Sequence, residues 1–131
     1  MRAIARREDG SLRHEVEVGH HRLTADEPRG RGGSDAGPNP QELLAASLAS
    51  CTAITVEMYA DRKGWDVGDV AVDVDYEPAQ RGSPTRFRMS VQLAKELPEE
   101  QREKLMQIAA KCPVHRTLEG EVMFDEKLEL A

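Results

Sequence analysis

The pattern of apolar and polar positions along the chain predicts six β-strands. Some of these strands are short and are separated by turn residues, and the longer ones show an alternation of apolar and polar residues. The predicted strands are residues 2–7, 12–18, 21–25, 70–76, 87–93 and 122–130. Between the third and fourth strands, the Gly- and Pro-rich segment 26–38 has no periodicity, which indicates a loop. Loops of this length inside a compact domain are usually functional or disordered.

A long helix is predicted over residues 40–63. Asn39 is a good N-cap, Pro40 suits the first helical position, and Glu42 completes a capping-box pattern. Because successive residues of a helix are rotated by about 100°, some of its side chains share one broad face with Cys51 at its centre. The residues predicted on this face are Leu44, Ser47, Leu48, Cys51, Ile54, Thr55, Met58 and Tyr59.

A second helix is predicted to begin at Pro98-Glu99. Its apolar face includes Leu105, Ile108, Ala109 and Cys112, at spacings of three and four residues. Pro113 ends this helix and can start a short new one with Cys112 as its N-cap. The predicted order β-β-β-α-β-β-α-β indicates an α+β fold, and 131 residues suit a single domain over positions 1–131.

Composition narrows the class of protein. The net charge is −6 and no Lys/Arg-rich face carries interleaved aromatics, which argues against a nucleic-acid partner. The first residues become charged too early for an export signal, so a cytoplasmic location is expected. Residues 43–60 are the only candidate membrane span, but they contain five polar or charged residues, and a buried core helix is the better interpretation. Only five aromatic residues are present, which suggests that a partner subunit completes the core.

The chain has only two cysteines, Cys51 and Cys112. Disulfides in a reducing compartment tend to be transient and either catalytic or redox-sensing, so the pair is interpreted as a redox couple. The alternative is that both are simply small buried hydrophobic residues. Cys112 lies at a predicted helix start between Lys111 and Arg116, surroundings that favour a thiolate.

Cys51, in the middle of an apolar helix, is expected to have a raised pKa unless a cation reaches it. The candidate cations precede it in the chain: Arg6, Arg7, Arg13, Arg29 and Arg31. A Cys51 thiolate activated in this way would suit an alkyl peroxide better than a charged substrate. Attack on the O–O bond gives a sulfenic acid, which condenses with a second thiol to a disulfide, and regeneration then needs an external dithiol.

Two motifs resemble those of a known family. The run GPNPQELLAASLASC, residues 37–51, resembles the central helix of the OsmC/organic hydroperoxide resistance family, and KCPVH, residues 111–115, resembles its second cysteine motif. The runs RLTADEP (22–28) and YADRKGW (59–65) are similar to the family's general branch.

The resemblance implies an OsmC-like fold, with antiparallel sheets on a long central helix, in an intertwined homodimer. It also implies a thiol peroxidase in which Cys51 attacks the hydroperoxide and Cys112 resolves the sulfenic acid. The reductant would be an external dithiol such as a lipoyl protein, and neither a cofactor nor a metal is implied.

The chain departs from the family at one position. Better-studied members have a Glu ten residues before the first cysteine, with an Arg that pairs with both, whereas this chain has Gln41 there. Glu42 follows one residue later and is either a capping residue or a substitute carboxylate. Arg31, twenty residues before Cys51, has the spacing of the functional Arg in part of the family. The candidate site therefore consists of Cys51, Cys112, Arg31, Gln41 and Glu42.

Two other interpretations remain open from the sequence. Cys51, Cys112 and His115 with His20 or His21 could form a zinc site, since two cysteines and two histidines are a known ligand set. Alternatively, the protein keeps the fold and the cysteines but acts as a redox sensor or binding module with little peroxidase activity. Gln41 is the support for this second alternative.

Overall fold

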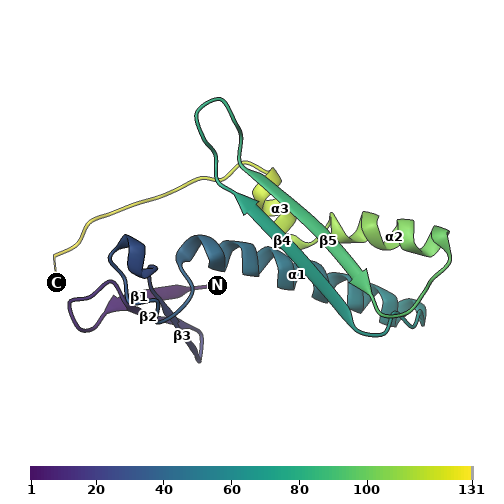
Figure 1. Cartoon of the computed structure of the whole chain (residues 1–131), viewed down its shortest axis with the longest axis horizontal. Coiled ribbons are helices and arrows are strands. Elements are labelled where there is room, and N and C mark those ends of the chain that lie inside the picture. The colour runs from purple at the N-terminus through teal and green to yellow at the C-terminus, as the bar shows by residue number, and fades with distance from the viewer. Residues whose placement is uncertain (131) are drawn as a thin grey trace. The chain divides into compact units, whose positions relative to one another are not determined.

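The computed structural model describes residues 1–130 and shows an α+β chain (Figure 1). Its elements are β1 (Ala3–Arg7), β2 (His14–Val18), β3 (His21–Ala25), the 3-10 helix η1 (Arg29–Arg31), α1 (Pro40–Lys63), β4 (Val70–Glu77), β5 (Arg86–Leu93), α2 (Glu99–Ala109) and α3 (Pro113–Glu119). The chain divides into two compact units, Met1–Ala46 and the part that begins at Ser47. The single domain expected over residues 1–131 therefore stays a prediction.

The first unit contains an antiparallel sheet in the order β1-β2-β3, in which Ala3 pairs with Val18 and His14 with Ala25. The predicted turn residues connect these strands, and Gly10 and Gly19 have the positive φ angles of 79° and 62° that glycine adopts readily. All three predicted strands are present, the first two with a later start than expected.

A buried carboxylate organises the loop that follows β3. Asp26 is 2% exposed, and its side chain accepts hydrogen bonds from the backbone N–H groups of Glu27 (2.8 Å), Ser34 (3.1 Å) and Ala36 (3.1 Å). The bond from Ala36 is the largest cause that holds the pKa of Asp26 below its ordinary value. Gly33 lies so close to the carbonyl of Glu27 that an added Cβ would be 1.9 Å from that oxygen. The predicted loop thus has a defined backbone, including η1.

Helix α1 begins with the predicted capping box. The Asn39 N–H donates to Glu42 Oε1 (3.0 Å), and the Glu42 N–H donates to Asn39 Oδ1 (2.8 Å). Helix α1 is the one helix among residues 1–130 that is long and apolar enough to cross a bilayer, which is weak evidence because core helices pass the same test.

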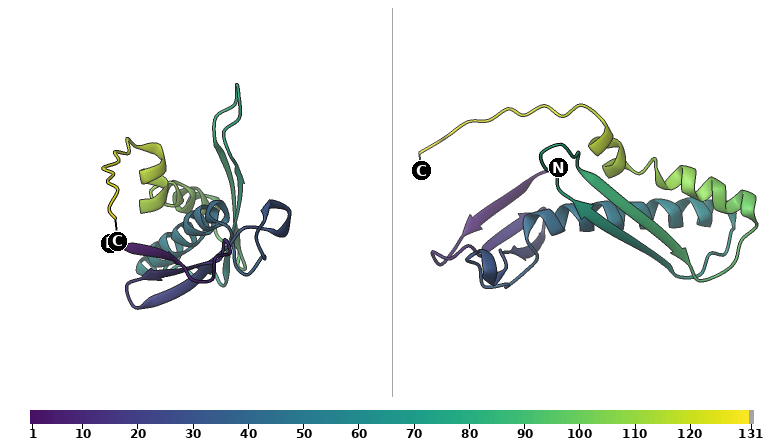
Figure 2. Two further views of the ribbon diagram at one scale, coloured as in Figure 1. Left: turned by 90° about the vertical axis from the view of Figure 1, so that its left-hand side faces the viewer. Right: turned by 45° about the horizontal axis from the view of Figure 1, so that its top comes forward.

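The second unit is built on a stripe of buried residues along α1. Leu48, Thr52, Val56 and Ala60 recur every four residues and are 0–2% exposed. The core around this stripe also contains Val67, with Leu105 and Ala109 from α2. The β4–β5 hairpin adds Val70 and Leu93, which pair with each other in its antiparallel register. The two views of Figure 2 show the hairpin and α2 alongside this part of α1.

The predicted broad face of α1, with Cys51 at its centre, is only partly packed within the single chain. The packed stripe runs through Thr52 and Val56, and Cys51 lies at its edge. Ile54 and Met58, placed on the same predicted face, are 54% and 62% exposed. The apolar residues of α1 extend around more of the helix than α2 and the hairpin can cover.

The prediction of a last strand over residues 122–130 is wrong. Residues 121–130 form neither helix nor strand, and all of them are exposed. A strand needs a neighbour that completes its backbone hydrogen bonds, and this segment pairs with no described strand. Its alternation of apolar and polar residues is therefore not sufficient to form a strand in the single chain.

Candidate active site

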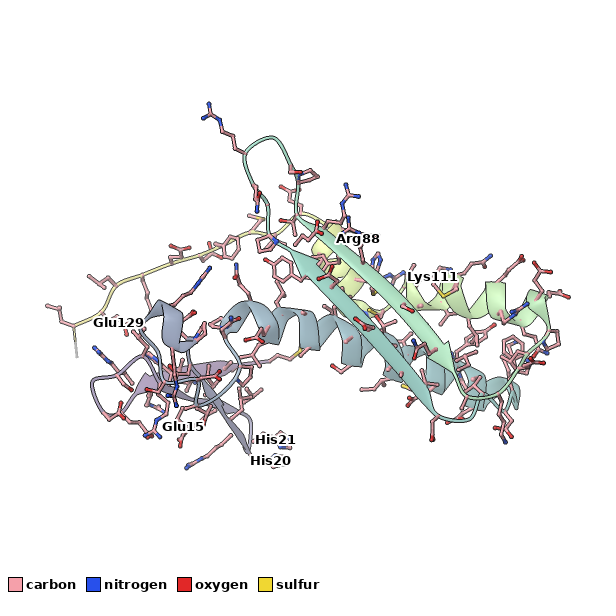
Figure 3. The ribbon with its side chains drawn as sticks, in the orientation of Figure 1. Glu15, His20, His21, Arg88, Lys111 and Glu129 are labelled. Atoms are coloured by element: carbon pink, nitrogen blue, oxygen red, sulfur yellow. The ribbon has the colours of Figure 1, made fainter. Side chains whose placement is uncertain are left out.

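The structure brings Cys51 and Cys112 together in the second unit. Cys51, on α1, is partly exposed, whereas Cys112, between α2 and α3, is fully buried. Figure 3 marks this junction by Lys111, the residue before Cys112. Both thiols are free, and the Cys51 side chain lies close enough to Cys112 for this neighbour to raise the pKa of the Cys51 thiol.

The start of α3 places backbone N–H groups near both sulfur atoms. Pro113 at the first helical position has no N–H, so the first free donors belong to Val114 and His115. The N–H of His115 donates to Cys112 Sγ at 3.3 Å, and the N–H of Val114 lies near enough to the sulfur of Cys51 to lower the pKa of that thiol. Cys112 is thus the N-cap of α3, which confirms the prediction from the Cys-Pro step.

The environment raises the pKa of the Cys51 thiol above its ordinary value. Burial is the largest cause, because it removes water from the thiolate, and the neighbouring Cys112 raises the pKa further. The N–H of Val114 and the hydroxyl of Thr55 act in the opposite direction, since both donate to the sulfur. The sequence-based expectation of a raised pKa is confirmed.

A third side chain, Thr52, joins the site and was not predicted from the sequence. Thr52 is 0% exposed, and its Oγ1 lies 3.7 Å from Cys112 Sγ and 3.6 Å from the Sδ of Met89 on β5. The one feature of the sequence that could have indicated it is the spacing of four residues from Leu48 to Thr52 and on to Val56, which marks the packed stripe of α1.

The other predicted site residues belong to the first unit. Gln41 and Glu42 are exposed in the first turn of α1, where the carboxylate of Glu42 serves the capping box. Arg31 is exposed on η1. The positions of these three residues relative to the two cysteines stay a prediction.

Contacts within the first unit distinguish the candidate arginines. Arg6 forms an ion pair with Glu17 (3.1 Å) and Arg13 one with Asp9 (3.4 Å), and Arg7 donates to the carbonyl of Ser11 at 2.6 Å. These three are held by their own hairpins, whereas Arg29 and Arg31 are exposed on η1.

The zinc alternative stays untested, because His20 and His21 belong to the first unit and the cysteines to the second. Within residues 1–130, no group of three or more His, Cys, Asp or Glu side chains is placed to hold a metal ion. The Nδ1 of His115 lies instead 3.0 Å from Oε1 of Glu119, near enough for an ion pair when the ring is protonated, although the two are not aligned for a hydrogen bond.

Comparison with known proteins identifies the family to which the chain is similar. A family model described as OsmC-like protein matches residues 32–127. A comparison with curated proteins found no significant match.

Several solved structures share the fold. An OsmC-like protein from Mycoplasma pneumoniae is 18% identical, with 91% of this chain and 86% of that chain covered and a TM-score of 0.76. An organic hydroperoxide resistance protein OsmC from Legionella pneumophila is 25% identical, with 92% and 90% covered and a TM-score of 0.60. The organic hydroperoxide resistance protein OhrB of Bacillus subtilis is 20% identical, with 91% and 90% covered and a TM-score of 0.59.

Proposed function

Since the chain belongs to the OsmC-like protein family, we propose that it is a thiol-dependent peroxidase that reduces organic hydroperoxides. The observation that carries the proposal is the pairing of a partly exposed Cys51 with a fully buried Cys112 that lies close enough to influence its thiol. A buried pair of structural cysteines would need no such difference in exposure.

The different exposure of the two cysteines supports the roles that we propose for them. The Cys51 thiolate attacks the distal oxygen of the hydroperoxide, the O–O bond breaks, and the alcohol leaves with a proton while Cys51 becomes a sulfenic acid. Cys112, reached only through the protein, attacks this sulfur and releases water as the disulfide forms. An external dithiol then reduces the disulfide to two thiols and becomes oxidised itself.

Two observations support an organic hydroperoxide as substrate. The Cys51 sulfur is buried enough to have a raised pKa, and such surroundings disfavour a charged substrate. Proteins of similar structure from Legionella pneumophila and Bacillus subtilis are described as organic hydroperoxide resistance proteins. We carry this substrate class over to the present chain as part of the proposal, together with a lipoyl-type dithiol as reductant and a cytoplasmic location.

The proposal includes a homodimer. Ile54 and Met58, one turn apart on α1, are more than half exposed in the single chain. The apolar residues Val122, Met123 and Phe124 of the C-terminal segment are exposed as well. Exposed large apolar patches are typical of a subunit interface, and we propose that a second copy of the chain covers these side chains.

Activation of Cys51 is assigned to an arginine of the first unit. Of the two arginines exposed on η1, Arg31 is the proposed residue because it lies twenty residues before Cys51, a spacing found in part of the family. Gln41 would accept a hydrogen bond from it through the side-chain amide oxygen. Glu42 already uses a carboxylate oxygen in the capping box. The missing carboxylate at position 41 is the observation that favours the second candidate function, a redox sensor that is oxidised but does not turn over.

A coupled assay separates these functions. Cumene hydroperoxide consumption is followed with dihydrolipoamide as the reductant, for the parent protein and for Cys51→Ser. We expect many turnovers by the parent and none by the variant. Oxidation that stops after one equivalent would favour the sensor, and a Cys51→Ser protein that kept most of its activity would contradict the assignment of Cys51.

A further inference from the structure

Thr52 has a buried hydroxyl that neither packing nor helix formation requires. It lies on α1 next to Cys51 in the chain, yet its side chain faces the other cysteine: Oγ1 is 3.7 Å from Cys112 Sγ and 3.6 Å from Met89 Sδ. The residue is 0% exposed, so water cannot serve the hydroxyl in place of these sulfurs. A hydroxyl has a single proton and can donate to only one of the two sulfurs at a time.

We propose that Thr52 is a positioning residue for Cys112. The hydroxyl of Thr52 stabilises the Cys112 thiolate that leaves when the Cys51–Cys112 disulfide is reduced. The inference rests on the disulfide of the proposed function and adds to it a residue that stabilises the leaving group of the reduction step. Thr52 acts together with the N–H of His115, the second donor to the same sulfur.

The direction of reduction follows from exposure. Cys112 is 0% exposed and Cys51 is partly exposed, so an external thiolate reaches the sulfur of Cys51. Its attack forms a mixed disulfide with Cys51 and breaks the S–S bond, and the electron pair of that bond goes to Cys112 Sγ. The second thiol of the dithiol then releases Cys51, and the two protons of the dithiol end on the two cysteines.

The two sulfur contacts of Thr52 give its hydroxyl one hydrogen-bond partner when Cys112 is a thiol and another when Cys112 is a thiolate. When Cys112 is a thiol, its S–H can donate to Thr52 Oγ1 while the Thr52 hydroxyl donates to Met89 Sδ. When Cys112 leaves as a thiolate, it becomes the stronger acceptor, because hydrogen bonds to an ionised partner are roughly twice as strong as those between neutral groups. The hydroxyl then turns from Met89 to Cys112, a rotation that requires no movement of the backbone. A better-stabilised leaving thiolate makes the exchange faster.

The test compares Thr52→Val, which removes the hydroxyl at nearly constant shape, with Thr52→Ser, which keeps it. Each protein is oxidised with diamide instead of a peroxide, and the disulfide is then reduced with excess dithiothreitol while free thiols are counted by alkylation and mass spectrometry. We expect reduction of Thr52→Val to be about tenfold slower than that of the parent, because one hydrogen bond to the leaving thiolate is lost. Thr52→Ser should stay within about threefold of the parent rate, which a role in packing alone would not explain.

The attacked sulfur gives a second readout. Glutathione in place of dithiothreitol should be trapped as a mixed disulfide on Cys51, and glutathione found on Cys112 would overturn the inference. Equal reduction rates for the parent and Thr52→Val would overturn it too. A protein in which diamide forms no intramolecular disulfide would refute both this inference and the proposed function. If the disulfide forms and Thr52→Val slows its reduction, but hydroperoxides are not consumed, only the peroxidase proposal fails.

Discussion

The backbone N–H of His115 donates a hydrogen bond to the Sγ of Cys112 at 3.3 Å, so the buried cysteine is also the residue that caps α3. The redox chemistry proposed for this sulfur and the stability of a helix terminus are therefore linked. A sulfur in a disulfide is a poorer acceptor than a thiolate, and each change in the oxidation state of Cys112 also changes the cap.

The first prediction separates the capping role of Cys112 from its chemistry. Cys112→Ser keeps a side chain that caps helices well, whereas Cys112→Ala leaves the N–H of His115 without its partner. We expect Cys112→Ala to be less stable than Cys112→Ser by about 1 kcal/mol, measured by urea denaturation of the reduced proteins. An alanine variant as stable as the serine variant would show that the cap contributes nothing.

The second prediction concerns the pH dependence of Cys51. Only the thiolate reacts, and burial raises the pKa of this thiol, so less thiolate is present at neutral pH than for a free cysteine. In Arg31→Ala, which lacks the cation proposed to activate the thiolate, we expect the rate of Cys51 alkylation by iodoacetamide to increase with pH and to keep increasing above pH ~8.5, the usual thiol pKa. The rate for the parent should level off at a lower pH than that of the variant, and identical profiles for the two proteins would mean that Arg31 does not reach the sulfur.

The third prediction concerns the position that departs from the family. A carboxylate at position 41 would hold an arginine by a charge-assisted bond, which contributes about 1.5–3 kcal/mol against 0.5–1.5 kcal/mol for a neutral one. Gln41→Glu should therefore speed the oxidation of Cys51 by roughly tenfold, if the difference acts fully on the transition state. The measurement is the second-order rate of Cys51 oxidation by cumene hydroperoxide.

Glu42→Gln is the matched control for this variant. The carboxylate of Glu42 accepts the N–H of Asn39, so its loss should weaken the start of α1 and leave the oxidation rate unchanged. If Glu42→Gln slows the reaction and Gln41→Glu does not speed it, Glu42 is the working carboxylate.

The fourth prediction tests the second subunit. Ile54 is 54% exposed on α1, and a charged side chain there would be buried without a partner in the proposed interface. We expect light scattering to report a dimer for the parent and a monomer for Ile54→Lys at micromolar concentration. Met106→Lys, at a 50% exposed apolar position on α2, should stay dimeric. A folded monomer for the parent would remove the dimer from the account.

Local patterns were sufficient to predict most of the elements. The capping box at Asn39 and Glu42 placed the start of α1, and the Cys112-Pro113 step placed the start of α3, because both signals depend on residues adjacent in the chain. The strand predicted over residues 122–130 was wrong because strand formation depends on a neighbour, and residues 121–130 have none in the single chain. Alternation of apolar and polar residues shows only that a segment could form a strand. It does not provide the neighbouring strand that the segment needs for its backbone hydrogen bonds.

The candidate site was predictable in part for the same reason. The two cysteines were evident from their rarity and their motifs. The role of Thr52 depends on a contact with Cys112, 60 residues further along the chain, and on the direction of the packed face of α1. Helical periodicity could not predict which face of α1 packs against the rest of the chain, because apolar residues occupy more of the helix surface than the chain's own elements cover.

The measurement that tests the central claim most directly is the intact mass of the reduced protein after one equivalent of cumene hydroperoxide. The account predicts that the parent loses two hydrogen atoms, as an intramolecular Cys51–Cys112 disulfide forms. In Cys112→Ser it predicts the gain of one oxygen atom, on a Cys51 sulfenic acid that dimedone traps. An unchanged mass with the hydroperoxide still present, or an oxygen gained by the parent without a disulfide, would contradict the claim that the two cysteines form a peroxide-driven redox couple.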